Sequence, residues 1–186
     1  MTRHQPVHAA NRPDFPAIWL VSDARNDALL AAALICLPRR SGLIWRHRHA
    51  AAGETRARLA ALMPMVTARG HAIALAGDAR EARRWKAAAA YGPASLLARG
   101  PALARLVTVH SLREIGEANR VRASALVLSP VFATRSHPDA RPLGVVRFRL
   151  LAARARAPVI ALGGMTAANA RRLAWRCWAA IDGLTP

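Results

Sequence analysis

The sequence predicts an α/β protein whose eight parallel strands close into a TIM-type (β/α)8 barrel. Three observations predict it: short apolar runs alternate with Ala-, Arg- and Leu-rich segments of helical period, eight such runs occur, and 186 residues suit one domain. Strands separated by helices pair in parallel through crossovers, and eight such units close most naturally as a barrel. A doubly wound open sheet is the structural alternative.

The expected strands are short runs of aliphatic residues, which is typical of strands buried on both faces. The second run is extended through Arg48, and the fourth is the weakest. In order, they cover Ala17–Ser22, Gly42–Arg48, His71–Ala76, Pro93–Ala98, Arg105–Val109, Ser124–Leu128, Pro158–Leu162 and Cys177–Ile181.

The segments between these runs carry signals for helix ends. Gly70 is the expected C-terminal stop of a helix that begins at Glu54. Ser111 with Glu114 forms a capping-box pattern, and Thr166 is a suitable N-cap. Further helices are expected up to about Leu37, over about Ala79–Ala90 and from about Val145.

The barrel is expected to fill residues 17–186, with residues 1–16 as an irregular N-terminal extension. The chain is shorter than the roughly 200 residues at the lower end for this fold. Pro186 follows the eighth strand closely, so we expect the last outer helix to be absent or vestigial. The strand surface left open would be covered by the N-terminal segment or by a partner subunit, which makes a homodimer an expectation.

Composition favours a cytoplasmic protein. No apolar run reaches the roughly 18 residues that span a bilayer, and the N-terminus lacks the apolar core of a secretion signal. Cys36 and Cys177 lie far apart, and nothing in their spacing pairs them.

The formal net charge of +18 raises the possibility of nucleic-acid binding, because Lys and Arg neutralise phosphates in such complexes. Lys86 is the only lysine, and the arginines are dispersed over predicted helical faces without interleaved aromatic residues. This pattern favours a solvated surface over a nucleic-acid face. The charge still favours small anionic ligands, such as phosphorylated substrates, through long-range attraction.

Chemistry in this fold is expected where the strands end at their C-terminal side. Gly163-Gly164 follows the seventh strand and leads into a helix, where glycines and free N–H groups suit a phosphate; the plain alternative is a tight turn. The long loop after the sixth strand contains Thr134, Arg135, Ser136 and His137, which could clamp an anion, although a mobile surface loop is the alternative.

Charged residues also follow the second and third strands. Arg46 and Arg48 share one face of the second strand, which suggests a phosphate or diphosphate contact. His47 and His49 lack a third ligand at suitable spacing, so a metal site there is disfavoured. Asp78 could bind Mg²⁺ together with a substrate phosphate, or it could be a helix N-cap.

Three segments resemble the thiamine-phosphate synthase family, including its TenI-type branch. Thr108-Val-His110 is similar to the family's Ser-x-His, and Ser129-Pro-Val-Phe-x-Thr134-x-Ser136 to its Gly-Pro-Val-Phe-x-Thr-x-Thr-Lys loop. Pro158-Val-Ile-Ala-Leu-Gly-Gly-Met165 with Asn169 resembles its Ile-Gly-Gly-Ile segment with a following Asn. The likeness covers most of the chain and is strongest from about Leu106 onward.

The family joins an aminopyrimidine diphosphate to a thiazole phosphate and releases pyrophosphate, with Mg²⁺ assisting. The resemblance implies two groups of site residues. The thiazole phosphate would be held by Thr134, Ser136, Gly163, Gly164 and the backbone of Ile181 and Asp182. Catalytic and diphosphate-binding roles would fall to Arg46, Arg48, Thr108 and His137, with Asp78 as a Mg²⁺ ligand.

The sequence departs from the family pattern mainly on the diphosphate side. Ile44 replaces a Gln, His137 replaces the Lys of the strand-six loop, and no acid occurs in Ser95–Gly100, where a second Mg²⁺ carboxylate is expected. Pro130 replaces the histidine of the TenI-type thiazole tautomerase, which speaks against that reaction.

Three functional interpretations therefore stay open. The first is a working synthase in which arginines partly replace Mg²⁺. The second is a non-catalytic or altered relative that binds thiazole or thiamine phosphate. The third, more remote, is a basic nucleic-acid-binding protein.

Overall fold

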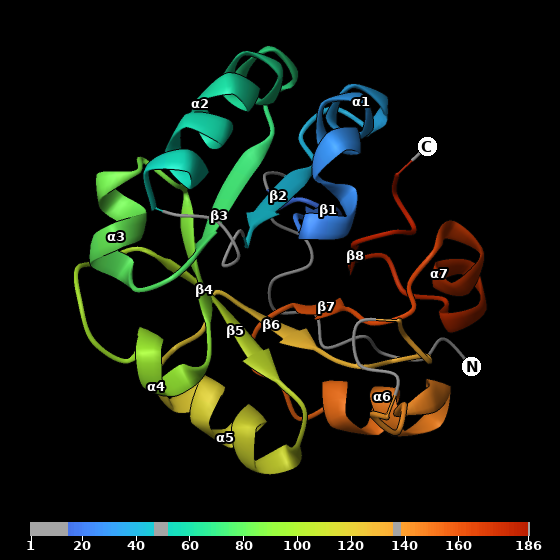
Figure 1. Cartoon of the computed structure of the whole chain (residues 1–186). Coiled ribbons are helices and arrows are strands. Elements are labelled where there is room, and N and C mark those ends of the chain that lie inside the picture. The colour runs from blue at the N-terminus through green and yellow to red at the C-terminus, as the bar shows by residue number, and fades with distance from the viewer. Residues whose placement is uncertain (1–14, 47–51, 136–138, 186) are drawn as a thin grey trace.

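The computed structural model describes residues 15–46, 52–135 and 139–185, and its eight parallel strands form a closed barrel inside a layer of helices (Figure 1). The strands follow one another around the barrel in chain order, and β8 pairs in parallel with β1. The predicted (β/α)8 fold is therefore confirmed.

The strands are short, and most of their residues are buried. They are β1 (Ile18–Val21), β2 (Gly42–Trp45), β3 (Ala72–Ala76), β4 (Ala89–Gly92), β5 (Ala104–Val109), β6 (Ala125–Leu128), β7 (Val159–Ala161) and β8 (Trp178–Ala180). The helices are the 3-10 helix η1 (Ala24–Leu29), then α1 (Leu30–Cys36), α2 (Ala52–Arg69), α3 (Ala79–Arg84), α4 (Ala94–Leu97), α5 (Leu112–Arg120), α6 (Gly144–Ala152) and α7 (Ala167–Leu173).

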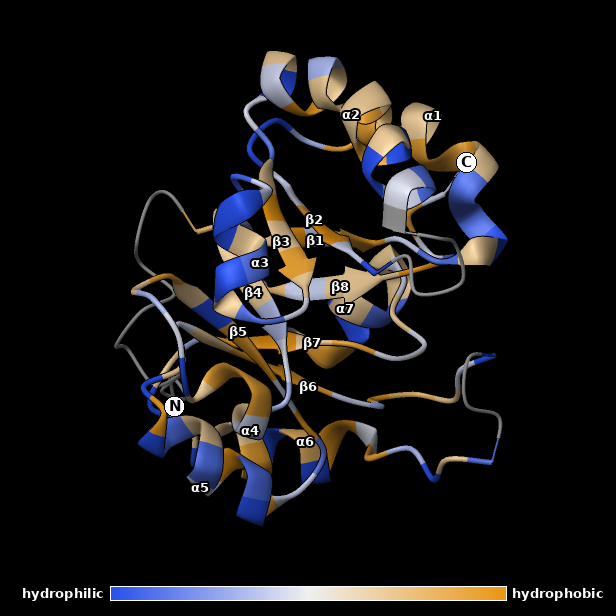
Figure 2. Cartoon of the chain, turned by 60° about the vertical axis from the view of Figure 1, so that its left-hand side comes forward, coloured by the Kyte–Doolittle hydropathy of each residue, from blue (hydrophilic) through white to orange (hydrophobic). Residues whose placement is uncertain are grey.

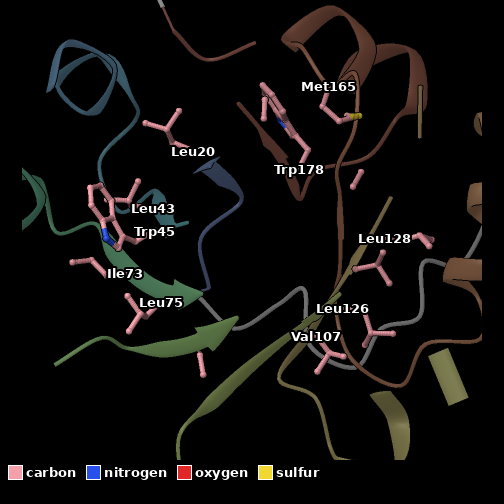
Figure 3. Close-up of a cluster of buried hydrophobic side chains, with 14 of the residues drawn as sticks. Leu20, Leu43, Trp45, Ile73, Leu75, Val107, Leu126, Leu128, Met165 and Trp178 are labelled. Carbon is pink, nitrogen blue, oxygen red and sulfur yellow. The ribbon is translucent and has the colours of Figure 1, made fainter. Parts of the chain in front are cut away.

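Alternation along the strands divides the core into two clusters, because successive side chains point to opposite faces. Trp19, Ile44 and Ile160 belong to the cluster inside the barrel. The outer cluster packs under the helices, and Figure 3 labels ten of its residues: Leu20, Leu43, Trp45, Ile73, Leu75, Val107, Leu126, Leu128, Met165 and Trp178. Hydropathy follows this division, since the strands are mostly apolar and polar residues gather on helices such as α3 and α5 (Figure 2).

The predicted fourth strand at Pro93–Ala98 is wrong, and so is the end of the preceding helix. That helix, α3, ends at Arg84, β4 is the Ala-rich segment Ala89–Gly92, and residues 94–97 form α4. Alanine favours helices, but here a buried run of small residues pairs with β3 and β5, so tertiary packing overrides propensity. Pro93, which cannot donate to a strand ladder, begins α4 as its N-cap.

Most predicted helix ends are confirmed. Gly70 stops α2 with φ 66°, and the Thr166 side chain caps α7 by accepting from Asn169 N–H. Ser111 caps α5, but the Glu114 carboxylate accepts from the His110 backbone N–H, so the reciprocal bond of a full capping box is replaced.

After β8, the described residues 181–185 contain no helix. Trp178 and Ala180 nevertheless face the outer core, and the partly buried Leu184 packs against that cluster. No helix in the described parts of the chain is both long and apolar enough to cross a membrane.

Candidate active site

A cavity of about 720 Å³ lies where the strands end at their C-terminal side. Its walls come from seven of the eight strand ends, and the residues on which the argument depends are Asp23, Arg46, Tyr91, Thr108, His110, Thr134, Gly163, Gly164 and Ile181. A volume of this size suits a small-molecule ligand. The end of the barrel expected to carry the site therefore contains a cavity of suitable size.

Gly163 and Gly164 are required by close packing against the loop after β6. Their φ angles are 92° and 60°, in the left-handed region that favours glycine. A Cβ on Gly163 would lie 2.7 Å from Pro130 Cα, and one on Gly164 would strike the Ala133 carbonyl oxygen. The loops after β6 and β7 are thus fixed together as one wall of the cavity.

Hydrogen bonds set the orientation of this wall. The Phe132 N–H donates to Gly163 O at 3.0 Å, and Asn169 Nδ2 donates to Gly164 O at 2.7 Å. Among the described residues, no protein acceptor pairs with the N–H of Gly163 or Gly164. With both carbonyls held by donors and both N–H groups unpaired, the turn can donate to an anion beside Thr134.

The loop after β8 continues the same wall. Ile181 lines the cavity, and its carbonyl accepts from Asn26 Nδ2 at 3.0 Å. The Asp182 carboxylate lies 3.4 Å from an Arg25 guanidinium nitrogen, which offsets its negative charge. This arrangement is compatible with an anion near the backbone of Ile181 and Asp182.

On the opposite wall, Arg46 is held by β1 and its following loop. The Arg46 N–H donates to the buried Ser22 Oγ at 2.7 Å, and its guanidinium donates to Asp23 Oδ2 at 2.7 Å. The other Asp23 oxygen accepts from Arg25 Nε at 2.8 Å. The counter-charge that an arginine at the barrel mouth needs is therefore supplied by the protein itself.

This pairing perturbs Asp23. Partial desolvation acts to raise its pKa, but hydrogen bonds from the side chain and backbone of Arg25 and from Arg46 outweigh desolvation and lower the pKa from 3.8 to about 2. Asp23 is accordingly ionised at any physiological pH. It is the one acidic residue among those that line the described cavity.

Thr108 and His110 extend from the end of β5 into the lining of the cavity. His110 Nδ1 lies 3.3 Å from the Glu114 carboxylate, which favours the tautomer with the proton on Nδ1 and leaves Nε2 to accept. Desolvation acts to raise the Glu114 pKa, but bonds from His110 N–H and the other donors prevail and lower it. His110 is therefore an oriented, half-exposed base.

Asp78 is occupied as the N-cap of α3. One carboxylate oxygen accepts from the backbone N–H groups of Arg80 and Glu81, at 2.8 Å each, and the bond from Glu81 is the main reason that its pKa is lowered. Asp78 does not line the cavity as described, and the described residues contain no group of three His, Cys, Asp or Glu suited to a metal ion. Its assignment as a Mg²⁺ ligand stays a prediction.

The remaining residues singled out from the sequence either lie outside the described part of the chain or do not line the cavity. Arg48, Ser136 and His137 lie outside the described residues, as do His47 and His49. Arg99, in the segment Ser95–Gly100 where a second carboxylate is expected, follows α4 and is exposed; it is not among the residues that line the described cavity.

Sequence reasoning missed Asp23 and the β4 contribution of Tyr91, Gly92 and Pro93. Tyr91 was assigned to no strand because the Ala-rich β4 resembles a helix. Asp23 carried a usable signal, since it directly follows Ser22 at the end of the first strand and the Asp-x-x-Asn26 spacing fits a helix start.

Comparison with known proteins gives the family. A model of the thiamine monophosphate synthase family matches residues 20–183. A putative thiamine-phosphate synthase 2 from Aquifex aeolicus is 39% identical over 59 residues, which are 32% of this chain and 32% of the relative. A thiamine-phosphate synthase from Chloroflexus aurantiacus is 38% identical over 65 residues, 34% of this chain and 30% of the relative. Each match thus spans about a third of the curated relative's length.

Solved structures agree on the fold. Thiamine phosphate pyrophosphorylase from Pyrococcus furiosus superposes with a TM-score of 0.74 at 22% identity, covering 89% of this chain and 85% of the other. A KDPG aldolase from Legionella pneumophila also superposes, with a TM-score of 0.62 at 14% identity over 90% of this chain and 83% of the other, so structural similarity alone does not select an activity. Because the family model spans nearly the whole chain, the protein belongs to the thiamine monophosphate synthase family.

Proposed function

We propose that this chain is a thiamine-phosphate synthase-type transferase that works on small phosphorylated substrates in the cytoplasm. In the proposed reaction, the bond between the pyrimidine methylene carbon and the diphosphate oxygen breaks, pyrophosphate leaves, and the thiazole nitrogen forms the new bond to that carbon. The observation that carries the proposal is the composition of the cavity lining, which combines Arg46 with Gly163 and Gly164, whose N–H groups have no protein acceptor among the described residues.

The thiazole monophosphate is assigned to the wall made by the loops after β6, β7 and β8. The N–H groups of Gly163 and Gly164 and the Thr134 hydroxyl supply donors, and the backbone at Ile181 and Asp182 closes the end. Ser136 belongs to the same expected set but lies outside the described residues. Backbone donors fixed in place stabilise an anion without the cost of reorganisation.

The departing pyrophosphate is assigned to Arg46, with Arg48 and His137 as expected partners outside the described residues. Departure leaves a cationic aminopyrimidine, which the ionised Asp23 on the same wall stabilises electrostatically. Thr108 and His110 offer a hydroxyl and an oriented imidazole to the pyrimidine between these walls.

The described residues do not fit the Mg²⁺ that the family uses. Asp23 is committed to Arg25 and Arg46, Asp78 caps α3, and no carboxylate follows β4 where the second ligand is expected. No step of the proposed reaction therefore passes through a metal. Arginine can neutralise diphosphate charge without one.

The test is an assay of purified protein with the aminopyrimidine diphosphate and the thiazole phosphate, each with and without Mg²⁺. We expect thiamine phosphate and pyrophosphate in equal amounts, and Arg46→Gln should lower kcat/KM by about 10²-fold or more. Arg113→Gln, an exposed change on α5, is the matched control. If calorimetry shows monophosphate binding but no turnover occurs under any condition, the protein is a non-catalytic relative.

A further inference from the structure

The opposite end of the barrel has an unusual charge distribution. Of the 10 acidic residues in the chain, all except Asp14 lie in the described part. Each of these either follows a strand or lies in the first two turns of the helix behind it: Asp23, Asp27, Glu54, Asp78, Glu81, Glu114, Glu117, Asp139 and Asp182. The turns that lead from helices back into strands contain no described acid.

Basic residues occupy these same turns. Because every helix returns the chain to the N-terminal ends of the strands, arginines that are dispersed in the sequence gather at one end of the molecule. Some bond to helix or turn carbonyls and serve the fold, such as Arg69 to Leu37 O and Arg149 to Leu173 O. Seven further cations in or beside these turns form no ion pair with any described residue: Arg40, Lys86, Arg120, Arg122, Arg154, Arg156 and Arg176. We call these seven the basic end.

Three residues of the basic end surround a hollow of about 430 Å³. Arg120 and Arg122 come from the end of α5 and the turn before β6, and Arg156 comes from the turn before β7. The Asn119 side chain joins the two turns, donating to Arg154 O and accepting from Arg156 N–H at 3.0 Å each. The hollow is thus a fixed surface with three guanidinium groups around it.

Backbone conformation gives an independent observation. Among the described residues, four other than glycine have positive φ: Arg40, Lys86 and Arg122, at 60°, 55° and 53°, and Ala174, at 49°, which also ends a helix at this end of the barrel. Left-handed backbone favours glycine or asparagine and costs a β-carbon residue roughly 1 kcal/mol. At this end of the barrel, three of these four left-handed positions carry a cation where glycine would be less strained.

We infer that the basic end binds the phosphate backbone of a nucleic-acid duplex, with the hollow as its central phosphate site. Unpaired like charges repel one another, and a polyanion relieves that repulsion. Arginine presents a planar fork that fits phosphate oxygens. Binding without sequence preference is expected, because phosphate contacts carry no base information.

The composition of this end favours nucleic acid over other polyanionic partners. Among the described residues, the large exposed apolar side chains lie on helices rather than in these turns, with Ile35, Leu96 and Leu150 in the last turns of α1, α4 and α6; the others are Leu29, Met63, Leu112 and Val146. A protein interface would have an apolar centre, and a membrane-binding surface would insert apolar side chains. A phosphodiester backbone needs only cations and hydrogen-bond donors.

The experiment uses fluorescence anisotropy of the full chain with a labelled duplex of about 20 base pairs, over a salt series. Arg120→Gln, Arg122→Gly and Arg156→Gln are combined in one variant. The control combines Arg56→Gln, Arg80→Gln and Arg147→Gln, three exposed arginines near the other ends of their helices, and removes the same charge. Arg122→Gly suits the left-handed backbone, so a folding defect is not expected from that change.

We expect wild-type binding in the micromolar range at low salt, and a loss of about tenfold or more in the hollow variant. In a plot of the logarithm of the binding constant against the logarithm of the salt concentration, the slope for this variant should become shallower by about one for each phosphate contact removed. The control should change binding less than threefold, and the hollow variant should retain any activity at the distant cavity. Equal losses in both variants, equally tight binding to polyglutamate or anionic vesicles, or tighter binding of pyrophosphate at the hollow would each overturn the inference.

Discussion

At the scale of single residues, Asp23 links the charge of the cavity to the stability of the fold. Its pKa is lowered to about 2, so its ion pairs stabilise the folded state above the unfolded pKa of about 3.9 and are lost as pH falls towards 2. We expect Asp23→Asn to have a lower Tm than wild type at pH 6, and the difference should shrink between pH 4 and pH 2.

Asp182→Asn is the control for this measurement, since the Asp182 carboxylate forms one ion pair within the described part of the chain, with Arg25 at 3.4 Å, and is more exposed than Asp23. Its effect on Tm should be small at every pH, as is usual for an exposed pair. The Tm values are measured by thermal unfolding followed by circular dichroism. If the Tm difference between wild type and Asp23→Asn stays constant from pH 6 to pH 2, the assigned role of Asp23 is refuted.

The glycines after β7 give the second residue-scale prediction. Gly163→Ala places a methyl group 2.7 Å from Pro130 Cα on a backbone at φ 92°, so either strain or displacement of the β6 loop must follow. We expect a loss of about 2 kcal/mol or more in unfolding free energy and weaker binding of thiazole monophosphate by calorimetry.

Gly116→Ala is the matched control, because Gly116 lies inside α5 and the new Cβ would meet only Arg120 at 3.7 Å. That change should stabilise the protein by about 0.5–1 kcal/mol. Equal effects of the two substitutions would mean that the wall between the β6 and β7 loops does not require glycine.

These residues also show what a sequence can and cannot reveal about a site. Gly163 and Gly164 are recognisable because they directly follow an apolar run, at the strand end where this fold binds its ligands. Asp23 is no less central, but its partners Arg25 and Arg46 and the neighbouring Asp182 are scattered along the chain, and closure of β8 onto β1 is needed to bring them together. Long-range pairing of this kind has no local pattern.

At the scale of elements, the backbone φ angle at a helix end decides whether glycine or alanine is the more stable residue there. Ala174 caps α7 with φ 49° and Ala153 caps α6 with φ −64°. We expect Ala174→Gly to stabilise the protein by up to about 1 kcal/mol, whereas Ala153→Gly should destabilise it by a similar amount. Both residues are exposed, so chemical denaturation of the pair isolates the effect of backbone conformation; shifts of the same sign would contradict the argument.

Element prediction succeeded where apolar runs are bounded by turn signals and failed where composition is ambiguous. β7 lies between Pro158 and Gly163 and is plain from the sequence. β4 is a strand because the barrel needs a narrow, small-residue segment between β3 and β5, although Ala87–Ala90 in isolation favours a helix. The useful local signal was Pro93, which a central strand cannot accommodate.

At the scale of the whole molecule, barrel closure depends on an outer surface that no described helix after β8 covers. Trp178 lies in β8, at the seam where this strand closes the barrel by pairing with β1 and β7. Its backbone N–H donates to Ala17 O at 2.9 Å, and its side chain belongs to the outer core together with Leu20 (Figure 3). It is only 6% exposed. The large indole ring therefore buries apolar surface on the outside of β8, as packed helices do on the outside of the other strands.

Replacing this cover should weaken the whole barrel, because β8 is the strand that closes it. We expect Trp178→Ala to cost about 3–5 kcal/mol and Trp178→Phe clearly less, with Tm falling by roughly 2–4 °C for each kcal/mol. Leu150→Ala, at a side chain that is 66% exposed, should stay within about 0.5 kcal/mol. A loss below about 1 kcal/mol for Trp178→Ala would show that the seam is held by other contacts. If the Tm of the wild type rises with protein concentration and that of Trp178→Ala does not, a second copy of the chain covers the seam, as expected for a homodimer.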